Sequence, residues 1–157
     1  MRLLTVAASI EIIATGLIAG IFIAIATTEP ARLSLEPSAF VQLQQGIHVV
    51  YGRLMPPLVI TAIIAGLVWL ILLRKQLMSA GFLLAAIATV CSIGAMILTV
   101  KVNFPLNDLL MTWSAASPPA NVKELWLPWE NAHMIRTVIY VVAFVSAITG
   151  NNLSRNK

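Results

Sequence analysis

Charged residues are scarce in this sequence. They make up 10% of the 157 residues, whereas 59% are hydrophobic. Soluble domains are about a quarter charged and about half apolar, so this composition excludes an ordinary soluble domain and predicts a protein of the lipid bilayer. The formal net charge of +4 is accounted for by membrane topology, as described below, and we expect no nucleic-acid partner.

Cysteine and histidine are also rare, which limits the redox and metal chemistry of the chain. Cys91 is the single cysteine, so an intrachain disulfide, a thiol-redox pair, a C-x-x-C-H haem attachment and a cysteine zinc cluster are excluded. We expect it to be a small core residue. The two histidines, His48 and His133, are few ligands for a non-haem iron or copper site, although Glu130 lies three residues before His133.

Long apolar runs dominate what remains. They cover residues 3 to 28, 55 to 73, 77 to 100 and 132 to 150, each near the ~20 residues that span a bilayer. The runs are continuous rather than alternating, and an open sheet would leave backbone groups unsatisfied in hydrocarbon, so helices are predicted. The first run is too long for a typical signal-peptide core, and we expect a retained helix. The predicted fold is all-α, an integral membrane four-helix bundle forming one domain over residues 1 to 157.

The basic residues predict the orientation of this bundle. Alternating crossings put the following residues on one side: Arg2, Arg74, Lys75, Arg155 and Lys157. Positive charge marks the cytoplasmic side, so we expect a multi-pass protein of the cell membrane with both termini in the cytoplasm. The opposite connections, residues 29 to 54 and 101 to 131, carry mixed charge.

The two outer connections contain helical signals of their own. Residues 38 to 54 follow Pro37 and carry one apolar stripe, formed by Phe40, Leu43, Ile47 and Val50, so the second helix is predicted to begin outside the membrane. Pro56 and Pro57 are expected to kink it. The fourth helix is also predicted to begin outside, with Asn121 as N-cap and Glu124 three residues later. Residues 102 to 110 are expected to form a loop.

Polar side chains recur at helical spacing at this outer end. On the fourth helix four residues spaced four, three and four apart fall on one face: Trp129, His133, Arg136 and Tyr140. On the second helix the corresponding face holds Gln44, His48, Tyr51 and Met55. The expected loop adds Asn103 and Asn107, whose amides both donate and accept hydrogen bonds. If both faces point inward, they line a polar chamber at the outer membrane boundary.

The same residues also have structural explanations. Trp129 can belong to an interfacial aromatic belt, Arg136 can snorkel to lipid phosphates, and the whole set can be a structural polar core. Glu11 is a separate outlier, because it is a carboxylate inside the first apolar run. Intramembrane acids are costly and commonly functional. However, Glu11 is expected to lie in the cytoplasmic half of the membrane, away from the outer chamber.

Four stretches together resemble a known family. They are T-G-L-I-A-G-I-F at 15 to 22, P-S-A-F-V-Q-L-Q-Q-G-I-H at 37 to 48, N-F-P-L-N-D-L at 103 to 109, and the element from Trp129 to Arg136. Their order along nearly the whole chain resembles the anthrone oxygenase family of small four-helix membrane proteins. The resemblance implies an oxygen-dependent enzyme that converts the central CH2 of an anthrone to the carbonyl of an anthraquinone.

A mechanism without a cofactor follows from the side chains. His48 or His133 is the expected base, since imidazole titrates near neutral pH. The groups expected to hold the developing oxyanion are Arg136, Asn103 and Asn107. Substrate contacts are expected from Trp129 and Tyr51, which can stack on flat rings, and from Gln44, Asn131 and Tyr140. The expected partners are the bilayer, O2 and a hydrophobic aromatic molecule of anthrone or quinol type.

Two other functions stay open at this stage. His48 and His133 could provide one or both axial ligands of a b-type haem that handles O2 or NO, with Arg136 pairing a propionate. A small proton-linked transporter or accessory protein could use Glu11, although the chain lacks an inverted repeat. Small-residue faces, such as Gly16 with Gly20 and Gly81 with Ala85, suit packing within a chain or in a homo-oligomer. The sequence leaves substrate, cofactor and oligomeric state undetermined.

Overall fold

The computed structural model describes residues 2 to 155, and within this range it is all-helical apart from short connections and one isolated bridge, Ser114 with Ser117. Four helical spans in this range are long and apolar enough to cross a membrane: Arg2–Thr27, Pro37–Leu72, Ala80–Thr112 and Val122–Ser154. The prediction of an all-α, multi-pass membrane protein with four helices is therefore confirmed.

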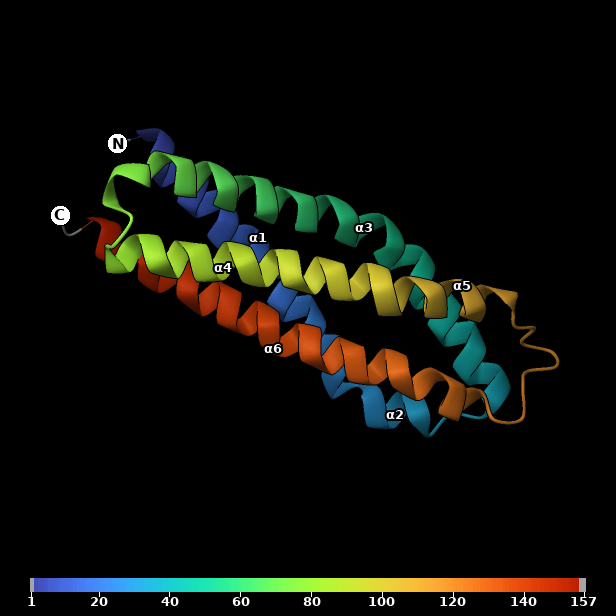
Figure 1. Ribbon diagram of the computed structural model, residues 1–157. Coiled ribbons are helices and arrows are strands. Elements are labelled where there is room, and N and C mark those ends of the chain that lie inside the picture. The colour runs from blue at the N-terminus through green and yellow to red at the C-terminus, as the bar shows by residue number, and fades with distance from the viewer. Residues whose placement is uncertain (1, 156–157) are drawn as a thin grey trace.

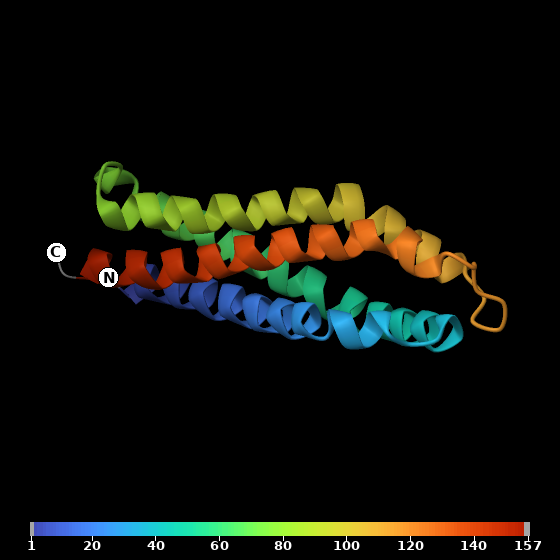
Figure 2. The same ribbon diagram turned by 90° about the horizontal axis from the view of Figure 1, so that it is seen from below.

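Consecutive long helices run in opposite directions (Figures 1 and 2). The start of α1 (Arg2–Thr27), the short η1 turn (Arg74–Gln76) and the end of α6 (Val122–Arg155) lie at one end of the bundle. The short α2 (Glu29–Leu33), the start of α3 (Pro37–Leu72) and residues 113 to 121 lie at the other end, called the outer end below. The helices thus bring Arg2, Arg74, Lys75 and Arg155 to the same end of the bundle, as predicted. Lys157 is outside the described residues. The assignment of this basic end to the cytoplasm stays a prediction.

Helix α3 is longer than the apolar run that predicts it. It begins at Pro37 and continues through Pro56 and Pro57 to Leu72, which confirms that the second helix starts well before residue 55. Because proline has no backbone N–H and crowds the preceding turn, the pair weakens the helix locally. Figure 1 shows α3 changing direction near this point and leaning toward α2 at the outer end.

The prediction of a loop at residues 102 to 110 is wrong. The third span contains α4 (Ala80–Leu98), a π-helical turn η2 (Thr99–Asn103) and α5 (Phe104–Thr112) in direct succession. Pro105 would break an ordinary helix interior, but it falls in the first turn of α5, where a missing N–H is tolerated. The backbone N–H of Phe104 bonds the carbonyl of Thr99, so the wider turn absorbs one extra residue and the span continues.

Helix α6 begins at Val122, directly after Asn121, so the prediction that the fourth helix starts outside residues 132 to 150 is confirmed. The outer ends of the helices are tied together by Gln45 on α3. Its side-chain Nε2 donates to the carbonyl of Leu110 at 3.0 Å and to that of Trp113 at 2.9 Å. The Leu110 carbonyl, which also accepts from the Trp113 N–H at 3.2 Å, and the Trp113 carbonyl thereby fix the C-terminal end of α5 to α3.

At the basic end the helices pack closely through small residues. Gly81 on α4 faces Gly150 on α6, and an added Cβ at Gly81 would lie 3.3 Å from the Gly150 carbonyl oxygen. In the middle of α1, an added Cβ at Gly16 would meet the ring of Phe144 at 2.7 Å. Both positions are therefore used for packing within the chain.

Candidate functional site

A cavity of about 690 Å³ lies in the outer half of the bundle, between α1, α3, the α4–η2–α5 span and α6. Most of its wall is apolar, as in typical small-molecule sites. The predicted site residues that line it are Gln44, His48, Tyr51, Asn103, Asn107, Trp129, His133, Arg136 and Tyr140. Asn131 does not line it and is exposed on α6. The two polar faces and the asparagines therefore share one chamber, as the helical spacing predicts.

Both asparagines of the N-x-P-x-N stretch contact Trp129. The side-chain Oδ1 of Asn107 accepts a 2.8 Å hydrogen bond from the indole Nε1–H, and Nδ2 of Asn103 donates to the Trp129 carbonyl at 3.4 Å. The expectation that both amides hold an oxyanion therefore changes for Asn103, whose amide donor points at the backbone of α6. Its buried Oδ1, by contrast, has no hydrogen-bond partner.

Trp129 stands in a column of stacked rings along α6. Its ring centroid lies 4.9 Å from that of Trp126, with planes at 16°, and 5.0 Å from that of His133, with planes at 13°. Since Trp126 precedes and His133 follows it on the same helix face, these neighbours cover the faces of the indole. The structure therefore differs from the expectation that Trp129 stacks on a substrate: it supports the wall instead.

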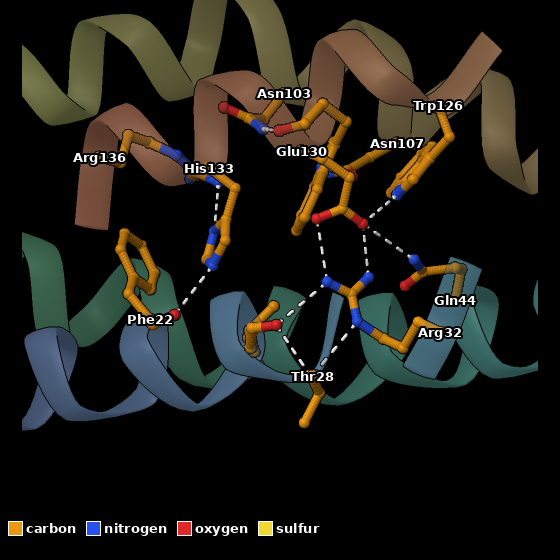
Figure 3. Close-up of polar contacts among 12 residues, drawn as sticks. Phe22, Thr28, Arg32, Gln44, Asn103, Asn107, Trp126, Glu130, His133 and Arg136 are labelled. Atoms are coloured by element: carbon orange, nitrogen blue, oxygen red, sulfur yellow. Dashed lines mark hydrogen bonds and ion pairs between the residues drawn. The ribbon is translucent and has the colours of Figure 1, made fainter. Parts of the chain in front are cut away.

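His133 is held at both ring nitrogens (Figure 3). Nε2 lies 3.1 Å from the carbonyl oxygen of Phe22, and Nδ1 lies 3.3 Å from Nη2 of Arg136. A carbonyl only accepts and a guanidinium only donates, so the ring is neutral, with its proton on Nε2 and its Nδ1 lone pair engaged. His133 is thus a positioning residue for Arg136, which differs from its expected use as a base.

Arg136 is buried on the cavity wall and surrounded by neutral groups. Its Nη1 donates to the Thr99 hydroxyl at 2.9 Å, and its guanidinium lies over the Phe22 ring, 4.9 Å from the centroid, and 5.7 Å from that of Trp129. Its Nε–H has no partner. The π-helical turn matters here because it contributes Thr99 and Asn103 at its two ends.

His48 is the histidine whose ring is available. It is half-buried on α3, lines the cavity, and has no hydrogen-bond partner among the described residues. Gly52 lies one turn later, and an added Cβ there would make an ordinary van der Waals contact with the ring, 3.7 Å from Cε1 of His48. Tyr51 is half-buried beside it on the same cavity wall.

An ion pair that the sequence analysis missed closes the outer end. Arg32 on α2 and Glu130 on α6 are both buried, and the guanidinium meets the carboxylate through two bonds of 2.5 and 2.9 Å (Figure 3). Such a bidentate arrangement fixes geometry as well as charge. Arg32 also donates to the Ile25 carbonyl at 3.1 Å, which ties the end of α1 to the same cluster.

Trp126 and Gln44 complete this cluster. Nε1 of Trp126 donates to Glu130 Oε1 at 3.0 Å, and the amide of Gln44 lies 3.4 Å from the same oxygen. With the amide reversed, the Gln44 oxygen accepts from Trp126 at 3.1 Å and from Arg32 at 2.5 Å. The four-residue spacing of Trp126 and Glu130 is visible in the sequence. Their partner Arg32 lies 98 residues from Glu130, and no periodicity links them.

The family comparison fits the resemblance seen in the sequence. A family model described as anthrone oxygenase matches residues 47–146. The chain belongs to the anthrone oxygenase family. The matched segment of this anthrone oxygenase family member includes His48, the N-x-P-x-N stretch and the Trp129-to-Arg136 element, whereas Arg32 and Gln44 precede it. Comparisons with curated proteins and with solved structures find no match.

Haem binding by two axial histidines would need a free ring nitrogen on both His48 and His133 of this family member. Both ring nitrogens of His133 are engaged by Phe22 and Arg136, so His133 does not fit an axial ligand, and only His48 has a free ring. The described residues also contain no group of three or more His, Cys, Asp or Glu side chains that could hold a metal ion. A site with two axial histidines therefore does not fit these residues.

Glu11 belongs to a different part of the protein. It is fully buried and does not line the cavity. Its Oε1 accepts a 3.3 Å hydrogen bond from the Thr89 hydroxyl on α4. Gly66 on α3 makes room for the carboxyl group, since an added Cβ would lie 2.6 Å from Oε1. Glu11 thus joins three helices, and no observation connects it to transport.

Proposed function

We propose that this protein is a membrane oxygenase that binds a hydrophobic aromatic molecule, of anthrone or quinol type, in the outer cavity and oxidises it with O2. The proposal rests on the side chains that meet in this cavity. Three side chains that line the same largely apolar cavity each have an unpartnered polar group: His48, Arg136 and Asn103. His48 supplies a base and Arg136 a cation, which are the groups needed to form and hold an enolate.

The first step is removal of a proton. The central C–H of an anthrone is acidic because the resulting anion is delocalised onto the ketone oxygen. The free imidazole of His48 takes this proton, and the negative charge that develops on oxygen is stabilised by the positive charge of Arg136. Such stabilisation is strong where water is excluded, and Arg136 is 5% exposed.

The second stage consumes O2, and its atoms and electrons balance. The anion passes one electron to O2, and the resulting radical and superoxide combine to form a C–O bond. The His48 imidazolium returns its proton to give a hydroperoxide. Loss of the second C–H proton and cleavage of the O–O bond then release water and leave a carbonyl. Overall, anthrone and O2 give anthraquinone and water.

The cavity wall suits entry from the lipid. Several apolar residues line the cavity and are also exposed on the outer surface of α3 or of the α4–η2–α5 span: Val49, Ile60, Val100, Phe104 and Met111. The chamber is thus bordered by lipid-facing side chains of two neighbouring helices. A membrane-dissolved aromatic can therefore enter sideways without crossing water.

Oxygen uptake by the purified protein with an anthrone tests this proposal. Product formation is followed by the anthraquinone absorbance, and one quinone is expected per O2 consumed. His48→Gln should lower kcat by about 100-fold or more, the usual contribution of a positioned base. Asn131→Ala is a matched control, because this exposed polar residue lies outside the cavity lining, and its rate should equal that of the wild type. Equal turnover without O2, or an unchanged rate in His48→Gln, would contradict the proposal.

A further inference from the structure

Three of the four tryptophans in the chain form one row, called the tryptophan row below: Trp129, Trp126 and Trp113. The ring centroid of Trp126 lies 4.9 Å from that of Trp129, with stacked planes, and 6.3 Å from that of Trp113, edge to face. Both separations are those of aromatic pairs in contact. Trp129 and Trp126 line the cavity, whereas Trp113 follows α5, is half-buried and lies outside the lining. The row therefore leads from the cavity to the outer end of the bundle.

The charges beside the row favour movement of a positive charge away from the cavity. The guanidinium of Arg136 lies 5.7 Å from the ring centroid of Trp129, and this cation disfavours a positive charge on that ring. The Nε1–H of Trp126 instead donates to a carboxylate oxygen of Glu130 at 3.0 Å (Figure 3). Although Arg32 also binds this carboxylate, a strong acceptor at the N–H stabilises an indole that has lost an electron. Trp126 is thus easier to oxidise than Trp129.

The tyrosines at the cavity do not offer an equivalent path. A phenol that is oxidised at neutral pH loses its proton at the same time, and the buried hydroxyl of Tyr140 has no partner to accept it. The ring of Tyr140 contacts Phe22, whose side chain is not readily oxidised. Tyr51 makes none of the ring contacts seen among the described residues. The tryptophan row is therefore the continuous path of oxidisable rings from the cavity.

We propose that the tryptophan row is an electron relay that removes oxidising radicals from the cavity. The inference rests on the proposed function for the source of these radicals. When superoxide leaves before it combines with the substrate radical, a second O2 adds to that radical and forms a peroxyl radical. One electron from Trp129 and one proton from the His48 imidazolium reduce the peroxyl radical to the hydroperoxide. This is the same hydroperoxide that the main route forms, and Trp129 is left as a radical cation.

The positive charge then moves outward by two electron transfers. Trp126 gives an electron to the Trp129 radical cation, and Trp113 gives one to that of Trp126. At Trp113 the radical cation loses its indole proton to water. A small one-electron reductant of the ascorbate or thiol class then supplies an electron at the half-buried Trp113, and water returns the proton. Each passage consumes one external electron and leaves the three rings unchanged.

A photochemical oxidant placed at the cavity edge tests the relay without substrate. Phe104 is exposed there, so the double variant Phe104→Cys with Cys91→Ser carries a single cysteine for a ruthenium(II) tris-bipyridine label. A flash and electron loss to a cobalt(III) quencher leave ruthenium(III), which takes one electron from the protein. After repeated flashes in air without reductant, peptide mass spectrometry locates the oxidised tryptophan. We expect the product mainly on Trp113.

Three variants of the labelled protein assign the path. Trp126→Phe interrupts the row, so Trp113 should lose most of its oxidation and Trp129 should gain it. Trp69→Phe is the matched control, because this fourth tryptophan is buried among residues of the basic half, and the product pattern should stay unchanged. In Trp113→Phe the product should move to Trp126, which decides the question if Trp126→Phe does not fold. Equal oxidation of Trp113 with and without Trp126, or wild-type product confined to Trp129, would overturn the inference.

Turnover adds a second readout that a purely structural role would not change. During oxidation of an anthrone in the presence of ascorbate, Trp113→Phe should show the wild-type initial rate but lose activity after fewer turnovers. Anthrone turnover without oxidation of Trp113 in the flash experiment would overturn the relay and leave the proposed function standing. Oxidation of Trp113 through Trp126 without anthrone turnover would do the reverse.

Discussion

The indole Nε1 of Trp129 and the side-chain Oδ1 of Asn107 are 2.8 Å apart and form a hydrogen bond between α6 and α5. This contact joins the two sequence elements that carry the family resemblance, the N-x-P-x-N stretch and the Trp129-to-Arg136 element. It also holds the middle ring of the column formed by Trp126, Trp129 and His133, which in turn orients Arg136. The elements are therefore parts of one wall.

Replacing Trp129 with phenylalanine should cost a measurable part of the stability. The substitution keeps an aromatic ring and removes the N–H, so the loss is that of one interhelical hydrogen bond, about 0.6 kcal/mol on average in membrane proteins. Thermal unfolding in detergent, followed by circular dichroism, measures it. Adding Asn107→Ala to Trp129→Phe should cost less than Asn107→Ala alone. Trp113→Phe is the control, because no hydrogen bond of that indole N–H is seen. Additive effects would contradict the contact.

Breaking the ion pair between Arg32 and Glu130 should be more costly. Glu130→Gln leaves a buried guanidinium without its counter-charge, and such changes cost about 3 to 5 kcal/mol. The double variant Arg32→Met with Glu130→Leu removes both charges and should recover much of this loss. The unfolding temperature measures both, with Glu36→Gln, an exposed acid, as the control. A single variant as stable as the wild type would show that the pair is not formed.

The ring of His133 should carry its proton on Nε2 at neutral pH. This tautomer is required by the Phe22 carbonyl on one side and the Arg136 guanidinium on the other. Nitrogen-15 NMR of protein labelled at histidine separates the two ring nitrogens by chemical shift. His48→Gln assigns the signals, since it leaves His133 as the only histidine. A protonated Nδ1 would exclude the described contact with Arg136.

Gly66→Ala should destabilise the basic half of the bundle. The added methyl would meet the carboxyl group of Glu11, 2.6 Å from Oε1, and also the Thr89 hydroxyl. Overpacking of this kind costs about 1 to 3 kcal/mol. Gly94→Ala is the matched control on α4, because nothing lies within 4 Å of its added Cβ, and alanine there should be neutral or stabilising. In a Glu11→Ala background the cost of Gly66→Ala should fall. An equal cost in both backgrounds would remove Glu11 as its cause.

The fold was predictable because membrane insertion is governed by local composition. Four apolar runs and the positions of prolines and basic residues predict four helices, their order and their shared basic end. The outer start of α3 was predictable from apolar spacing after Pro37, and that of α6 from the capping residues Asn121 and Glu124. The continuation of the third span was not, because Pro105 signals a helix break and only the π-helical turn, Thr99–Asn103, absorbs it.

The candidate site, like the fold, was predictable in part. Helical spacing was enough to place His48, Tyr51, His133 and Arg136 on two faces, and these faces do line one cavity. Helical spacing does not show which polar atoms already form hydrogen bonds with other protein groups. The tertiary contacts show that both nitrogens of His133 are engaged, whereas the ring of His48 has no partner.

By itself, then, the sequence determined a helical membrane bundle with polar residues gathered at its outer end, because these properties follow from hydropathy and periodicity along the chain. The tertiary structure alone decided that Arg32 neutralises Glu130 across 98 positions, and that Arg136 is left with neutral neighbours. Charge pairing depends on distances in space, and in a low-dielectric interior a few ångströms separate a paired ion from an unpaired one.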